Sequence, residues 1–226
     1  MIRLLRLTTA TIVLAFIIHT ASGAKPLCAA NASNSVVSPA RAAAQEGVLQ
    51  ILGVLRERNL DRDARTEKIR AIMDDFLDFD TFSRLSIGPT WRDWSDEQRG
   101  QFVDEFRKHM LGIAAKSTKN YDDEDVVILS DEPEKNGDCT VHCRVLGKMK
   151  DGVQEDVGRL DFRLRPREDR WKVIDVHVAG ISMANTFRAQ FLVIMKDGGI
   201  DKLLKMLHER NAGGPDKPTR TADAQK

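Results

Sequence analysis

Residues 171–187 read WKVIDVHVAGISMANTF, and this stretch decides the fold. Residues 171–178 predict a strand that is apolar on both faces, because successive side chains of a strand alternate between its two sides. One side would carry Trp171 and Val173, and the other would carry Ile174, Val176 and Val178. The segment Gly180-Ile181-Ser182 then predicts a turn into a helix. Other elements must therefore cover both faces of this last strand.

The sequence before this strand alternates apolar and polar residues, which predicts further strands. We expect short strands over 126–129, 139–145 and 160–164. Asn136-Gly137 and Asp151-Gly152 lie between them and are typical of hairpin turns. Strands joined by tight turns pair with their sequence neighbours, so the sequence predicts an antiparallel meander.

Helical periodicity flanks the strands on both sides. Apolar residues recur at helical spacing over 48–55 and 69–76, and Ser95-Asp96-Glu97-Gln98 is a capping box that begins a third helix. After the strands, apolar residues keep helical spacing over 187–207, with an interruption at Gly198-Gly199. The order predicts an α+β fold, with N-terminal helices, a twisted antiparallel sheet meander and C-terminal helices.

The N-terminal residues predict export. Residues 1–24 combine a basic start, a short apolar middle and a small-residue exit, which is the pattern of a cleaved secretory signal peptide. The apolar middle is shorter than the roughly 20 residues that a bilayer span needs. We expect a linker over 25–37, the folded domain over 38–210 and a disordered polar tail over 211–226.

Composition excludes several classes of protein. The chain has 226 residues, 42% of them hydrophobic and 31% charged, which fits one soluble domain and excludes collagen-like and fully disordered proteins. Its 35 Lys and Arg residues nearly balance its 34 Asp and Glu residues. A net charge this small creates no field that attracts a polyanion, so we expect no nucleic-acid partner.

The cysteines and acidic runs do not predict a metal site. On one extended strand the Cα atoms of Cys139 and Cys143 would lie roughly 13 Å apart, which exceeds the reach of a disulfide. His142 would point to the opposite face of that strand. The acidic runs at 74–80 and 122–125 lack the glycine spacing of a calcium loop. We therefore expect small core cysteines and no metal.

The segment Gly180-Ile181-Ser182-Met183-Ala184 approximates the nucleophile elbow of α/β-hydrolases. An elbow requires parallel strands crossed by helices, together with an acid and a histidine later in the chain. This sequence predicts a meander, and His208 is the only histidine downstream. We expect Ser182 to cap the following helix and expect no catalytic residue. A secreted serine hydrolase that uses Ser182 remains the alternative.

Four stretches of the chain carry a family resemblance. They are 69–92, which ends in LSIGPTWR, and then 95–106, 171–176 and 180–191. In this order they are similar to the MlaC family of periplasmic phospholipid-binding proteins, also called toluene-tolerance or ABC-transporter auxiliary proteins. The resemblance spans residues 45–208.

The resemblance implies a periplasmic lipid carrier rather than an enzyme. Its helices and sheet would enclose an apolar pocket that takes the acyl chains of a glycerophospholipid, bound as cargo and not as a cofactor. The implied partners are the MCE-domain subunit of an inner-membrane ABC transporter and an outer-membrane lipoprotein complex. We expect a monomer. Related members associated with hopanoid synthesis make a hopanoid the alternative cargo.

Apolar side chains on both strands and helices are the candidate lining of this pocket. They are Trp91, Phe102, Phe106, Met110, Val141, Leu160, Phe162, Trp171, Val173, Val176, Phe187 and Phe191. We expect the strand residues to face the helix that carries Phe102. The alternative is an ordinary packed core in a periplasmic adaptor, because periodicity does not distinguish a core from a cavity. We expect Arg92 and Arg188 to form ion pairs, the alternative being contact with a lipid phosphate.

Overall fold

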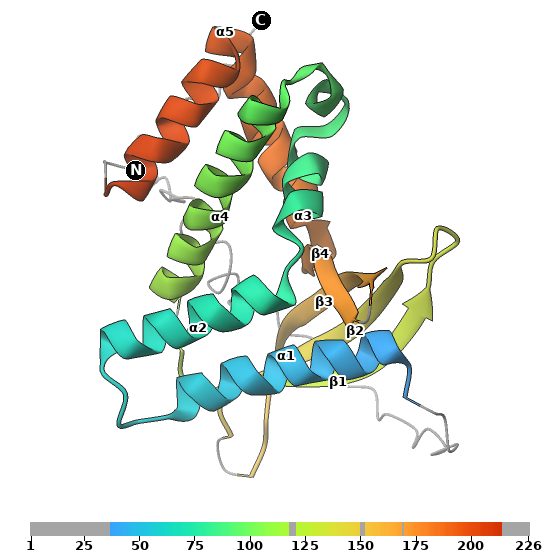
Figure 1. The fold of residues 1–226 in the computed structure, drawn as a ribbon. Coiled ribbons are helices and arrows are strands. Elements are labelled where there is room, and N and C mark those ends of the chain that lie inside the picture. Colours follow the sequence, from blue (N-terminus) through green and yellow to red (C-terminus); the bar gives the residue numbers. More distant parts are fainter. Residues whose placement is uncertain (1–36, 118–120, 150–151, 169, 214–226) are drawn as a thin grey trace, which may run out of the picture.

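The computed structural model describes residues 37–117, 121–149, 152–168 and 170–213. The predicted signal peptide, linker residues 25–36 and tail residues 214–226 lie outside the described residues. Within them, the order of helices, strands and a final helix confirms the predicted α+β class (Figure 1). No helix in this part of the chain has both the length and the apolar character that a membrane crossing requires.

The first half of the domain is helical. Its elements are α1 (Pro39–Arg56), α2 (Arg62–Phe76), α3 (Phe79–Ile87), the 3-10 helix η2 (Gly88–Asp93) and α4 (Asp96–Ser117). The second half contains the sheet and the last helix. Its elements are β1 (Asp125–Pro133), β2 (Cys139–Leu146), β3 (Asp156–Arg167), β4 (Arg170–Val178), β5 (Ile181–Ser182) and α5 (Met183–Asn211).

Side-chain caps fix where the helices begin. Ser38 accepts a hydrogen bond from the backbone N–H of Arg41 at 3.1 Å, and Pro39 occupies the first helical position of α1. Ser95 and Gln98 exchange two hydrogen bonds, at 3.0 and 3.2 Å, at the start of α4. Each cap satisfies an N–H group that has no partner inside its helix. The predicted capping box is confirmed.

Helix α3 is separate from α2, a break that the helical periodicity does not reveal. Leu77 forms a parallel bridge with Val173 of β4, and the backbone N–H of Asp78 donates to the carbonyl oxygen of Val173 at 2.9 Å. The Asp78 carboxylate then accepts from the N–H of Thr81 and caps α3. The sheet therefore interrupts the helical path at this point and redirects the chain.

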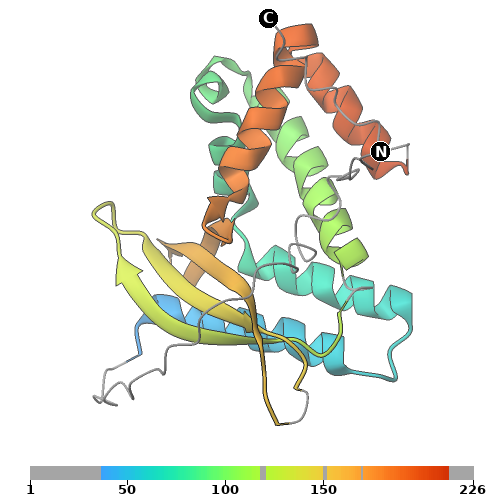
Figure 2. The same cartoon turned by 180° about the vertical axis from the view of Figure 1, so that it is seen from behind.

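The sheet is an open meander in the order β1-β2-β3-β4-β5, with antiparallel pairing between neighbours, as predicted. Helix α1 crosses one face of it (Figure 1). Seen from behind, the opposite face carries no helix of the described chain (Figure 2). The sheet therefore has one face in the interior and one outer face.

A bulge in β4 overturns the predicted side-chain pattern of this strand. Phe162 pairs with Val176 but Leu164 pairs with Val173, so Ile174 is an extra residue in the ladder. Cross-strand partners lie on the same face of a sheet. The prediction that Val173 and Val176 point to opposite sides is therefore wrong, because the bulge brings both onto the interior face.

Helix α5 bends at Gly198 and Gly199, which have non-helical backbone angles, as the sequence predicts. Its second part ends beside α4, where the side-chain amide of Asn211 donates to the backbone and carboxylate oxygens of Glu105 at 2.9 and 2.7 Å. Asn211 therefore belongs to the folded domain, one residue beyond the predicted boundary at 210.

Candidate functional site

Aromatic rings from η2, α4 and α5 form one cluster. Phe102 stacks on Phe106 with ring centroids 5.4 Å apart, and Phe187 stacks on Phe191 at 5.6 Å. The two stacks meet edge to face, with Phe106 at 5.0 Å from Phe187 and 5.4 Å from Phe191. Trp91 meets Phe102 at 6.2 Å. These five candidate lining residues lie together in an arrangement that aromatic pairs favour.

A second group lies on the interior face of the sheet. It contains Val141, Leu160, Phe162, Trp171, Val173 and Val176, and Val141 and Val173 are fully buried. Phe162 pairs with Val141 on one side and with Val176 on the other. Met110 of α4 belongs to the same buried cluster as members of both groups. All twelve candidate residues therefore border the same apolar interior.

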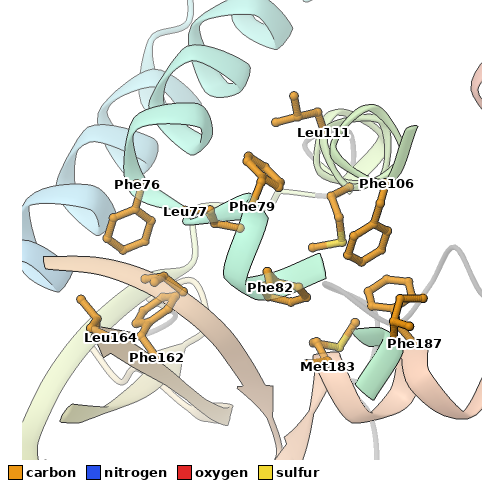
Figure 3. Close-up of a cluster of buried hydrophobic side chains, with 14 of the residues drawn as sticks. Phe76, Leu77, Phe79, Phe82, Phe106, Leu111, Phe162, Leu164, Met183 and Phe187 are labelled. Carbon is orange, nitrogen blue, oxygen red and sulfur yellow. The ribbon is translucent and has the colours of Figure 1, made fainter. Parts of the chain in front are cut away.

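Helix α3 lies between the two groups. We expected the strand residues to face α4 directly, but α2, α3 and α5 each contact both β4 and α4. In Figure 3 the rings of Phe79 and Phe82 lie between Phe76 and Phe162 on the sheet side and Phe106 on the helical side. The break after α2 thus inserts a further helix between part of the sheet and α4.

Several apolar residues that the sequence did not single out belong to this interior. They are Phe76, Phe79, Phe82, Trp94, Leu164 and Met183. Trp94 lies edge to face with Phe102 at 5.4 Å, and Phe76 lies edge to face with Phe162 at 5.7 Å. Phe79 and Phe82 lie three residues apart on α3, and this helical spacing is the signal that could have identified them.

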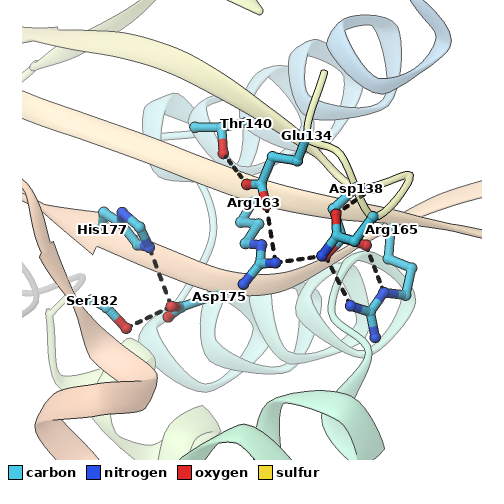
Figure 4. A network of polar contacts seen from close by, with 9 residues as sticks. Glu134, Asp138, Thr140, Arg163, Arg165, Asp175, His177 and Ser182 are labelled. Carbon is cyan, nitrogen blue, oxygen red and sulfur yellow. Dashed lines mark hydrogen bonds and ion pairs between the residues drawn. The ribbon is translucent and has the colours of Figure 1, made fainter. Parts of the chain in front are cut away.

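Ser182 is a helix cap and lacks the partner that a nucleophile needs. Its Oγ accepts from the N–H of Asn185 at 3.1 Å and donates to Asp175 Oδ2 at 2.5 Å (Figure 4). His177 Nε2 binds the same carboxylate at 3.2 Å. A catalytic serine directs its proton to an imidazole. Here the proton points to a carboxylate, so the geometry favours the predicted cap over the hydrolase alternative.

The outer face of the sheet holds its charges in close pairs. Asp138 binds Arg163 and Arg165 at 2.8 and 2.6 Å, and Asp161 binds Arg159 at 2.8 Å. Burial alone would raise the pKa of each aspartate, but contacts with arginine outweigh it and lower both pKa values. These carboxylates therefore stay ionised and occupied by protein groups.

The cysteines are confirmed as core residues. Cys139 and Cys143 are buried and unpaired, and burial raises the pKa of Cys143 to about 12, so its thiol stays protonated. Within the part of the chain that the structure describes, no three His, Cys, Asp or Glu side chains are grouped to hold a metal ion.

Arg188 binds a backbone carbonyl instead of a carboxylate. Its Nε and Nη2 donate to the carbonyl oxygen of Leu85, at 3.0 and 2.5 Å. Gly88 has a φ of 79°, and a Cβ at that position would lie 2.9 Å from Nε of Arg188. The predicted ion pair of Arg188 is therefore wrong. The predicted ion pair of Arg92 is wrong as well, because no carboxylate among the described residues pairs with it. Arg188 instead joins two of the family-like stretches.

The contact between Asp175 and His177 predicts how stability varies with pH. The hydrogen bond to Asp175 raises the pKa of His177 despite burial. Such a group stabilises the fold below its unfolded pKa of about 6.5, and the contribution disappears as pH rises through the folded pKa. We expect the free energy of unfolding, from urea titrations between about pH 6 and 8, to fall with a slope that His177→Gln reduces. An unchanged slope in His177→Gln would contradict this prediction.

The sequence and the fold of this chain are similar to those of known proteins. Residues 43–209 match the sequence profile of the family described as MlaC protein. No curated protein matches the chain. A phospholipid-binding protein from Ralstonia solanacearum, solved in complex with a phospholipid, matches with a TM-score of 0.65 and 24% sequence identity. The match covers 78% of this chain and 98% of that one. At this identity the likeness shows a shared fold.

Proposed function

The chain belongs to the MlaC family, and on this basis we propose that it is a lipid carrier that binds a glycerophospholipid by its acyl chains. The observation that carries the proposal is the family match, because it extends over residues 43–209, from within α1 to within α5. The bound phospholipid of the Ralstonia solanacearum protein supports the same ligand class on the same fold.

The lipid would lie in the apolar interior between the sheet and the helices, lined by the twelve candidate residues. Each buried methylene contributes about 0.8 kcal/mol, so two acyl chains provide ample affinity without a charged site. Aliphatic chains also require no hydrogen bonds from the lining, which fits the two apolar groups on either side of α3. A ligand so well shielded leaves slowly, so release needs a partner that offers another apolar environment.

The proposed place of action is the periplasm. The signal peptide predicted over 1–24 and the family membership support it. There the carrier would exchange lipid with the MCE-domain subunit of an inner-membrane ABC transporter and with an outer-membrane lipoprotein complex, and so maintain the lipid asymmetry of the outer membrane. It would act without a catalytic residue or cofactor, as a monomer.

We expect the purified mature protein, residues 25–226, to carry phospholipid. Native mass spectrometry should show a mass increment that matches one phospholipid, and solvent extraction should release it for identification. Protein stripped of lipid should take up phospholipid from vesicles. A chain that carries no lipid and accepts none would refute the carrier function, and a hopanoid in the extract would replace the proposed cargo.

The same preparation tests the hydrolase alternative. A fluorophosphonate probe labels serines that are activated as nucleophiles. We expect none on Ser182, because its hydroxyl donates to Asp175 rather than to an imidazole. Labelling of the folded protein that Ser182→Ala abolishes would establish the alternative.

A further inference from the structure

Two buried hydroxyl groups on α3 have no hydrogen-bond partner among the described residues. Ser83 and Ser86 are both 0% exposed, and neither Oγ has a hydrogen-bond partner there. A serine inside a helix ordinarily turns its hydroxyl to solvent or bonds the carbonyl four residues earlier. Unpartnered buried polar groups are rare because they are unfavourable. This pair therefore requires an explanation.

Other buried or half-buried hydroxyl groups near α3 and on α5 do have hydrogen-bond partners. Thr81, on the same helix and 3% exposed, accepts a hydrogen bond from Arg167. Thr90 and Thr186, which are half-buried elsewhere, donate to backbone carbonyls. These three threonine hydroxyls are therefore hydrogen-bonded, whereas those of Ser83 and Ser86 are not.

The environment of Ser83 and Ser86 is the apolar interior. Ser83 follows Phe79 by four residues and Ser86 follows Phe82 by four, so the serines share a helix face with these rings. The ring of Phe82 lies 6.0 Å from that of Phe106 on α4. The two serines therefore lie on the same face of α3 as Phe79 and Phe82, which belong to the buried cluster that we propose lines the lipid site.

Close helix packing alone does not explain the hydroxyls. Helix α3 packs tightly against α5, and small side chains permit this. Alanine would permit it equally well, has a higher helix propensity and buries no polar atom. The hydroxyl groups themselves therefore need a role that alanine could not fill.

We propose that Ser83 and Ser86 donate hydrogen bonds to the ester carbonyl oxygens of a bound diacyl lipid. This inference rests on the proposed carrier function. An ester carbonyl accepts hydrogen bonds, and a glycerophospholipid has two such groups where its acyl chains join the glycerol. Residues three apart on a helix place two donors about 5–6 Å apart on one face. The serines would therefore determine how deeply the chains enter and would select ester-linked lipids.

The test compares diester and diether phospholipids that have the same headgroup and chain length, because the ether lacks the carbonyl. We expect the wild-type protein to bind the diester about tenfold more tightly, as two modest hydrogen bonds allow. The Ser83→Ala/Ser86→Ala variant should bind both lipids equally. Without lipid it should melt at a higher temperature than wild type, because two unpartnered hydroxyls are gone. Thr186→Ala, which removes a hydroxyl that is already bonded, should keep the diester preference.

Each outcome separates the two proposals. A wild-type protein that binds both lipids equally would refute the role of the serines but leave the carrier function intact. One that binds neither would refute the carrier function itself. A double variant that keeps the diester preference would overturn the inference. If the double variant does not fold, the single variants carry the same test, and the wild-type comparison needs no variant at all.

Discussion

The Phe106→Ala variant is expected to lose about 3–5 kcal/mol of the free energy of unfolding, the range for truncation of a buried phenylalanine. Phe106 is 0% exposed, and its ring lies at the centre of the aromatic cluster. Its neighbours are the rings of Phe82, Phe102, Phe187 and Phe191, at 6.0, 5.4, 5.0 and 5.4 Å. Truncation removes all four contacts and leaves a cavity that packed helices do not refill.

Urea denaturation of the lipid-free protein measures this loss. Leu160→Ala is the matched control, because Leu160 is a half-buried candidate lining residue on the sheet and should cost less than half as much. Repeating both titrations with phospholipid separates packing from lipid contact, since a lining residue also changes the gain in stability on lipid binding. A loss below about 1 kcal/mol in Phe106→Ala would contradict its central place in the core.

Features that depend on neighbouring residues could be predicted from the sequence. The capping box at Ser95 and Gln98 and the cap at Ser182 act over three residues, and the structure confirms them. The bulge at Ile174 depends on the register of β4 against β3, which no local pattern records. The end of α2 is likewise set from a distance, because Leu77 bridges to a strand that forms much later in the chain.

The candidate site follows the same division. Phe102 and Phe106, like Phe187 and Phe191, lie four apart and form the predicted helix faces. What these helix faces pack against depends on α3, and the sequence pattern did not predict α3 as a separate helix. The acceptor of Arg188 could not be predicted, because it is a backbone carbonyl and every residue has one. The carbonyl of Leu85 is available because it lies near the end of α3, where carbonyl groups have no partner inside the helix.

The Asp175→Ala variant is expected to lose about 3–5 kcal/mol, the range for removing one partner of a buried charged contact. Asp175 is 4% exposed and accepts from four donors: the N–H of Val176 at 2.8 Å, His177 Nε2 at 3.2 Å, Ser182 Oγ at 2.5 Å and the N–H of Ala184 at 3.0 Å. Burial alone would raise its pKa, but these hydrogen bonds outweigh burial and lower it, so the carboxylate is ionised at neutral pH. It therefore also offers a negative charge to the start of α5, which favours one.

Comparison with two milder variants identifies what fastens α5 to the sheet. Asp175→Asn keeps an acceptor for the N–H of Ala184 but loses the charge, so its stability should lie between those of wild type and Asp175→Ala. Ser182→Ala removes a helix cap and should cost about 1 kcal/mol. Urea denaturation at neutral pH gives all three values, and hydrogen exchange over 183–187 shows whether the loss is local to α5. Equal losses in Ser182→Ala and Asp175→Ala would contradict the prediction. The expected order makes the carboxylate the main anchor of the helix that carries Phe187, with the serine of the elbow-like segment as one of its donors.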